Sequence, residues 1–166
     1  SRIVVNSGEI APVMKQAIVS VEDRRYWEHR GVDFRGIMRA VWADVRNKKV
    51  VQGGSTITQQ FVKNTYTKRE RTISRKLKEA ALAWQLERRW SKDRILTAYL
   101  NTIYFGNGAY GVEMAARVYF HSHASRLTLP QAALLAGLPA SPGAYDPVEN
   151  PSRARLRRAT VLNLMV

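Results

Sequence analysis

The chain has 166 residues, 45% of them hydrophobic, which is enough for one domain with a substantial core and too little for two. Its formal net charge of +14 predicts attraction to a polyanion, an anionic membrane surface or a phosphate-bearing substrate. The lack of cysteine excludes disulfide bonds and thiolate metal sites. The longest apolar run, residues 132–138, is far shorter than the ~20 residues that a bilayer span needs.

The two ends of the sequence bear on its domain organisation. No signal peptide precedes Ser1, and the chain stops at Val166 within an expected helix. We therefore expect residues 1–166 to be a single domain excised from a longer protein, with any membrane anchor outside it.

The first expected helix begins near Pro12, which suits a first helical turn. Its apolar face is formed by Met14, Ala17, Ile18 and Val21. Glu22 lies one turn beyond Ile18 on the same face, where partial desolvation disfavours the charged form and makes the carboxylate a better proton acceptor. The alternative is a surface ion pair between Glu22 and Arg24 or Arg25.

A second expected helix follows Asp33, whose side chain can cap it. Its apolar positions follow the helical period and are Phe34, Ile37, Met38, Val41, Trp42 and Val45. The opposite face carries Arg35, Arg39 and Arg46. Two interpretations stay open: the apolar face packs into the core, or the helix lies in a membrane interface.

The segment 53–64, GGSTITQQFVKN, places polar groups at the start of another helix. Thr56 and Gln59 have the spacing of a capping box. Thr56, Gln60 and Lys63 line up on one face of the expected helix. Because hydroxyl groups and free backbone donors at a helix start favour anions, this face predicts contact with phosphate or sugar.

A basic helix is expected from Arg71 to Trp90. We predict that its core-facing side chains are Ile73, Leu77, Ala80 and Trp84. A second face carries Arg71, Arg75 and Glu79 at steps of four residues. That spacing fits a solvated ion pair of small energy, but the excess of cations in this stretch favours a bound anion.

The rest of the chain also reads as helical. Further helices are expected over 91–100, 112–120 and 128–137 and from Pro151 onward. No strand pattern of useful length appears, so the predicted fold class is mainly α. His29 is interpreted as a hydrogen-bonding partner of the loop that enters Asp33, and His121 and His123 as part of a surface loop rather than a metal site.

Four long strings occur in a fixed order. They are EDRRYWEHRG from Glu22, GGSTITQQ from Gly53, RKLKE from Arg75 and KDRILTAYLNTIYFGNGAYGVEMAARVYF from Lys92. Together with PASPGAYDP from Pro139, they resemble the peptidoglycan glycosyltransferase family, the polymerising domain of class A penicillin-binding proteins and of monofunctional transglycosylases. The resemblance covers nearly the whole chain. Two departures are Tyr26, where the family usually has phenylalanine, and His121, where glycine is common.

This resemblance implies a lysozyme-like fold with a larger lobe and a smaller membrane-facing lobe. It also implies polymerisation of lipid II, a disaccharide-pentapeptide joined through pyrophosphate to a polyprenyl chain, on the outer face of the bacterial cytoplasmic membrane. The implied partners are lipid II, nascent glycan strands, the membrane surface and other proteins of cell-wall synthesis, and the implied inhibitor is moenomycin. No nucleic acid is expected as a partner.

The resemblance also assigns roles to single residues. Glu22 is implied as the general base that takes the proton of the acceptor sugar hydroxyl, with Asp23 in support. Glu79 is implied as a second acid that acts through Mg²⁺ or Mn²⁺, or by ordering nearby cations. The implied pyrophosphate site is formed by Lys63, Arg71, Arg75, Ser55, Thr56 and Gln60. Because the donor bond is α and the product bond β, one in-line displacement suffices, without the covalent intermediate of retaining glycosidases.

Two other functions are weighed against this one. A lysozyme-like glycoside hydrolase also uses two carboxylates on a helical scaffold, but it needs no cation-rich face beside Glu79. A basic nucleic-acid-binding protein would account for the charge of +14, but not for an acid that completes the apolar face of a helix.

Overall fold

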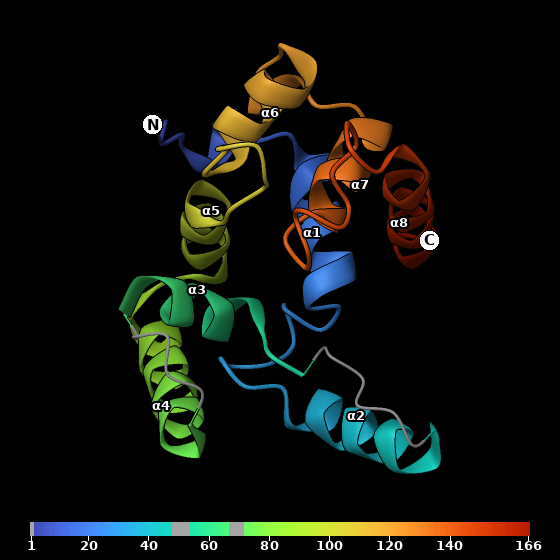
Figure 1. Cartoon of the computed structure of the whole chain (residues 1–166). Helices are drawn as coiled ribbons and strands as arrows, with labels where there is room; N and C mark the ends of the chain where they lie inside the picture. Colours follow the sequence, from blue (N-terminus) through green and yellow to red (C-terminus); the bar gives the residue numbers. More distant parts are fainter. Residues whose placement is uncertain (1, 48–53, 67–71) are drawn as a thin grey trace.

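The computed structural model describes residues 2–47, 54–66 and 72–166 (Figure 1). In chain order, its helices are η1 (Ser7–Glu9), α1 (Pro12–Glu22), α2 (Phe34–Asn47), α3 (Ile57–Tyr66), α4 (Ile73–Arg89), α5 (Lys92–Thr102), α6 (Val112–Phe120), η2 (Ala124–Arg126), α7 (Leu129–Gly137) and α8 (Pro151–Leu164). The only strand-like features of the described residues are isolated β-bridges. The prediction of a mainly α fold is therefore confirmed.

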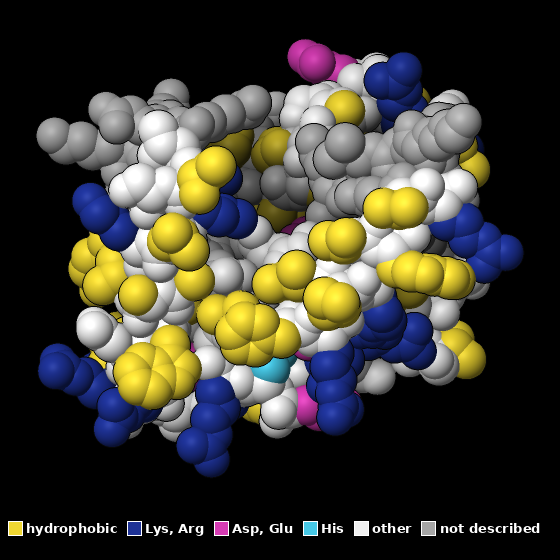
Figure 2. Space-filling view, turned by 90° about the horizontal axis from the view of Figure 1, so that it is seen from below, with side chains coloured by type: hydrophobic (Ala, Val, Ile, Leu, Met, Phe, Trp, Pro, Cys, Tyr) yellow, Lys and Arg dark blue, Asp and Glu magenta, His cyan; other side chains and the backbone are white. Residues whose placement is uncertain are grey.

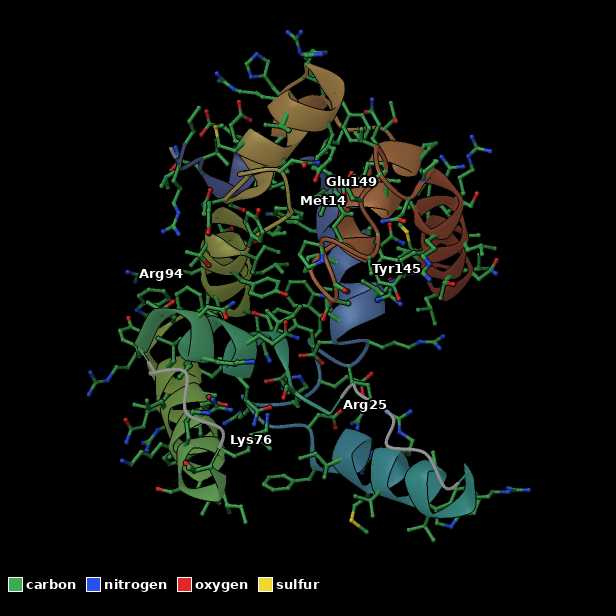
Figure 3. All side chains as sticks on the ribbon, viewed as in Figure 1. Met14, Arg25, Lys76, Arg94, Tyr145 and Glu149 are labelled. Carbon is green, nitrogen blue, oxygen red and sulfur yellow. The ribbon has the colours of Figure 1, made fainter. Side chains whose placement is uncertain are left out.

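Helix α1 is packed against α7 and α8, which also pack against each other (Figure 1). Met14, Ala17 and Ile18 are fully buried, which confirms the predicted apolar face of α1; Met14 is labelled in Figure 3. The small side chains of Ala132 and Ala136 on α7 are also fully buried and allow the helices to approach closely. The core thus fixes α1 along its length, up to Glu22 at its end.

The start of α3 is held by the predicted capping box. The backbone N–H of Thr56 donates to Gln59 Oε1 (2.9 Å), and the N–H of Gln59 donates to Thr56 Oγ1 (3.1 Å). The Thr56 hydroxyl also donates to the carbonyl oxygen of Gly31 (2.6 Å). Gly31 has a φ of +88°, and a Cβ there would lie 2.8 Å from the backbone of Ala83, so this position requires glycine. These contacts fix α3 relative to the loop after α1.

Helix α2 begins at its predicted cap, because Asp33 Oδ1 accepts a hydrogen bond from the N–H of Gly36 (3.0 Å). Its apolar face does not enter the core: Phe34 is 74% exposed, Met38 69% and Trp42 66%. The interpretation of this face as core packing is therefore wrong. Periodicity shows that a helix has an apolar face, but not what that face meets.

The predicted core face of α4 is also wrong. Ile73 is 83% exposed, Leu77 68% and Trp84 48%. The buried residues of α4 are Glu79 and Ala83, because α4 packs against α3 through the face that carries Glu79. Figure 2 shows the result: hydrophobic side chains cover much of the face seen from below, with lysines and arginines around its edge. Among the described helices, none combines the length and the apolarity that a bilayer crossing requires.

Candidate active site

Glu22 is the last residue of α1, and it is partly buried. The side-chain amide of Gln60 donates to Glu22 Oε2 (3.1 Å), while Oε1 is buried and accepts no hydrogen bond from any described residue. Burial raises the pKa of Glu22 above its usual value; the hydrogen bond from Gln60 and the positive charge of Arg157 oppose this rise only in part. One oxygen of a carboxylate with increased proton affinity thus has no hydrogen-bond partner among the described residues.

Tyr99 on α5 sets the direction of the Gln60 amide. The phenol of Tyr99 donates to Gln60 Oε1 (3.0 Å), so the NH₂ group of the amide faces Glu22. Burial raises the pKa of Tyr99 well above its usual value, which keeps the phenol protonated as a donor. From the sequence, Tyr99 was predicted only to be buried, and its contact with Gln60 was not foreseen. The one available signal was its hydroxyl group, which needs a partner when it is buried in an apolar stripe.

Asp23 is bound by groups of the protein itself. His29 Nε2 lies 2.9 Å from Asp23 Oδ1 and 2.8 Å from Oδ2, and the N–H of Ile57 donates to Oδ2 (3.0 Å). The hydrogen-bonding role expected of His29 is therefore found, but with the Asp23 carboxylate as its partner. Since Ile57 is the first residue of α3, Asp23 fixes the end of α1 against the start of α3 and so places Gln60 beside Glu22.

Glu79 is only 1% exposed and lies among cations. Its carboxylate is 3.0 Å from Arg75 Nε and 4.0 Å from Lys76 Nζ. Lys76, labelled in Figure 3, also donates to Ser55 Oγ (2.6 Å) and so connects α4 with the segment before α3. The ion pair read from the sequence exists, but it is buried rather than solvated, and it holds two cations in fixed positions.

Both acids line one cavity of about 320 Å³. Its wall includes Glu22, Gln60, Lys63 and Glu79, with Arg157 contributed by α8. The two carboxylates, far apart in the sequence, therefore meet across a single space with cations on its wall. This is the arrangement that the assigned roles of Glu22 and Glu79 require.

Glu22 also lines a second cavity, of about 350 Å³. It shares Glu22 and Ser55 with the first cavity and is also lined by Arg24, Arg25 and Arg39. Arg25 Nη1 is bound to Asp33 Oδ1 (2.8 Å), which orients one of these cations at the start of α2. Glu22 thus borders two cation-lined spaces, each large enough for part of a phosphorylated sugar.

Arg157 is a site residue that sequence reasoning missed. Its Nε donates to the carbonyl oxygen of Gly137 (3.3 Å), and its guanidinium lies 5.3 Å from the ring centre of Tyr145. The sequence showed only a basic last helix, and the packing of α8 on α1 and α7 brings this one arginine to the cavity. No local pattern distinguishes it from the other arginines of α8.

The remaining predicted site residues divide into three groups. Lys63 is exposed and lines the first cavity, while Arg75 contacts Glu79. Thr56 is engaged in capping and in its bond to Gly31, although it also lines the second cavity. Arg71 lies outside the described residues.

The resemblance implies a Mg²⁺ or Mn²⁺ ion at Glu79. Within the described ranges, no group of three His, Cys, Asp or Glu side chains is arranged to hold one. The ion-pair partners of Glu79, Arg75 and Lys76, are cationic, whereas Mg²⁺ and Mn²⁺ prefer oxygen ligands. Among the described residues, Arg75 and Lys76 lie within 4.0 Å of the Glu79 carboxylate, and a divalent ion at this acid stays a prediction.

Comparison with known proteins places this chain in a family. A family profile described as Transglycosylase matches residues 1–166. Penicillin-binding protein 1A of Aquifex aeolicus is 49% identical over 99% of this chain and 23% of its own length. The proteins of the same name from Neisseria flavescens (49% identical, 93% of this chain, 19% of that protein) and Neisseria lactamica (46%, 96% and 20%) are also similar. The chain thus spans about a fifth of these relatives, and it belongs to the transglycosylase family.

Proposed function

We propose that the chain polymerises lipid II into peptidoglycan glycan strands. In this reaction the growing strand, linked to lipid pyrophosphate, is transferred with inversion to a hydroxyl group of the acceptor sugar. Glu22 takes the proton from that hydroxyl as the general base. The observation that supports this proposal most strongly is the single cavity that holds both Glu22 and Glu79 with Lys63 and Arg157 on its wall.

The two cavities beside Glu22 correspond to the two substrates. The donor pyrophosphate occupies the cavity of Glu79, where Lys63 and Arg157 offset the charge that develops as the diphosphate leaves. The acceptor occupies the cavity of Arg24, Arg25 and Arg39, whose cations suit its own phosphate groups. A base that borders both spaces can accept a proton from one substrate while charge develops on the other, as a single displacement demands.

The raised pKa of Glu22 fits the role of general base. A base accepts a proton best when its pKa approaches the working pH, and burial moves the carboxyl group in that direction. Gln60, oriented by Tyr99, donates to Oε2 and favours the charged carboxylate before the transfer. Glu79 acts indirectly, because it orders Arg75 and Lys76 beside the donor cavity.

We further propose that the exposed apolar faces of α2 and α4 rest on the outer surface of the cytoplasmic membrane that carries lipid II. Phe34, Met38 and Trp42 on α2 and Leu77 on α4 are exposed to an extent that water disfavours. A chain that draws a polyprenyl-linked substrate from the bilayer needs its site close to the lipid surface. The face seen in Figure 2 would provide that contact.

A polymerisation assay tests the proposal. The native chain incubated with lipid II in detergent should form glycan polymer, and Glu22→Gln should reduce the rate by about 10²-fold or more. Glu149→Gln, which makes the same chemical change at an exposed position, serves as the control and should keep the native rate. Release of fragments from purified glycan strands, without polymer from lipid II, would establish the hydrolase instead.

A further inference from the structure

A third hollow, separate from the two cavities at Glu22, is bordered by tryptophans. It has a volume of about 660 Å³, and it shares none of its lining residues with the cavities at Glu22. Trp27 comes from the loop after α1, Trp84 from α4, and Trp90 from the turn before α5. We call this space the tryptophan hollow. Trp27 is 57% exposed and Trp84 48%, so both indoles present much of their surface to whatever fills it.

The acidic groups of the tryptophan hollow already have partners. Glu87 Oε1 accepts from Lys92 Nζ (2.8 Å) and from the Thr58 hydroxyl (2.7 Å). Glu28 Oε2 is bound to Arg25 Nε (2.9 Å). The charge of both carboxylates is thus already balanced, and neither needs a cationic ligand.

Two arginines of the same hollow, unlike its acidic groups, have no partner of opposite charge among the described residues. Arg30 and Arg88 are exposed, and within the described part of the chain neither is within ion-pair distance of a carboxylate. The guanidinium of Arg88 lies over the Trp84 ring, 4.8 Å from its centre, which fixes its direction without neutralising its charge. The hollow therefore offers positive charge beside aromatic surface, which suits an anion that is joined to an apolar group.

The position of the hollow on α4 indicates what that apolar group is. Ile73, Leu77, Trp84 and Arg88 are spaced by four, seven and four residues and so share one face of the helix. Along this face the exposed side chains change from aliphatic to indole to guanidinium. Tryptophan and arginine at the end of an exposed apolar face match the order of layers in a bilayer, from acyl chains to interface to headgroup.

We propose that the tryptophan hollow binds the phosphate headgroup of an anionic phospholipid, with Arg30 and Arg88 on the phosphate and the indoles of Trp27 and Trp84 at the level of the glycerol backbone. This inference rests on the membrane contact in the proposed function and gives it a specific headgroup site. The contact makes docking of the chain depend on lipid charge. It also sets the orientation of α4, and with it Glu79, relative to the membrane.

Flotation with vesicles tests the assignment. Vesicles of phosphatidylcholine with an increasing fraction of phosphatidylglycerol should bind the native chain increasingly well. The double variant Arg30→Gln with Arg88→Gln should bind the phosphatidylglycerol vesicles roughly 25-fold more weakly, since each cation at an anionic surface contributes about fivefold. The matched control is Arg153→Gln with Arg155→Gln, which removes the same charge from exposed positions on α8 and should change binding less than about twofold.

The other outcomes have defined meanings. An equal loss of vesicle binding in the two double variants would show that only the overall charge of the chain acts. It would overturn the proposed headgroup site. Stabilisation of the native chain by inorganic phosphate, lost in the Arg30 and Arg88 variant without any difference in vesicle binding, would assign the hollow to a soluble phosphate instead. Polymerisation of lipid II in detergent, which needs no vesicle, should be unchanged in the Arg30 and Arg88 variant. Failure of the headgroup site is thus distinguishable from failure of the proposed function.

Discussion

Replacing Gln60 with leucine tests how the base is tuned. Leucine has a similar size but cannot donate to Glu22 Oε2, a hydrogen bond of 3.1 Å in the native chain. That bond favours the charged carboxylate, so its loss should raise the pKa of Glu22 further. The base must be deprotonated to act, and the acid limb of the activity profile should therefore move to higher pH.

The size of this shift follows from the geometry. A hydrogen bond to a charged group contributes roughly 1.5–3 kcal/mol, and water that reaches the partly open Glu22 replaces about half of it. The remaining ~1 kcal/mol corresponds to a shift of roughly 0.5–1 pH unit, since one pKa unit is about 1.4 kcal/mol. Tyr99→Phe keeps the amide but removes its anchor, so it should shift the limb in the same direction by a smaller amount.

The assay is the pH dependence of kcat for lipid II polymerisation, which reports the pKa of the base in the enzyme–substrate complex. Gln85→Leu makes the same change at an exposed position of α4 and should leave the profile unchanged. An acid limb that stays in place in a folded Gln60→Leu variant, or moves to lower pH, would refute this account of how Glu22 is tuned.

Two further predictions concern stability. Because the folded pKa of Glu22 lies above its usual value of 4.5, the native state holds this proton more tightly than the unfolded chain, and stability falls as pH rises through that window. Glu22→Gln should therefore melt at a higher temperature than the native chain at pH 8, with the difference shrinking as the pH falls toward 4.5 in thermal melts. Arg75→Ala removes a cation from the buried Glu79 and should lower the free energy of unfolding by roughly 1–2 kcal/mol, less than for a fully buried pair because Lys76 remains. Urea titration measures this loss, and adding Glu79→Gln should recover part of it; equal instability of the double variant would contradict the buried pair.

The sequence predicted local features of the fold well. The apolar face of α1, the cap at Asp33 and the capping box at Thr56 and Gln59 depend on residues three or four positions apart, where helical geometry fixes the contacts. These features also placed Glu22 at the end of a buried face. The position of Glu22 was thus readable before any tertiary contact was known.

The errors have a common physical cause. Phe34 and Trp42 on α2, and Ile73 and Leu77 on α4, follow the period of a core-facing helix, yet their faces are exposed. The same period results when an apolar face meets a lipid surface, so the pattern does not decide between the two environments. The burial of Glu79 in place of Leu77 depends on which side of α4 meets α3, which is a tertiary choice.

The missed site residues depend on contacts between distant segments. Tyr99 acts on Glu22 only through Gln60, and Arg157 reaches the cavity only because α8 packs on α1 and α7. Each looks ordinary in its own segment, one as an apolar-stripe residue and the other as one arginine among several. Such roles follow from packing, and periodicity does not encode them.

The central claim is that Glu22 borders both a donor cavity and an acceptor cavity. A crystal structure of the chain with a non-reactive lipid diphosphate sugar, an analogue of the donor, tests it most directly. The account predicts a diphosphate beside Lys63 and Arg157, in the cavity that Glu79 also lines, with Glu22 facing the space bordered by Arg24 and Arg39. A diphosphate bound away from Lys63 and Arg157, with Glu22 pointing away from both cavities, would contradict it.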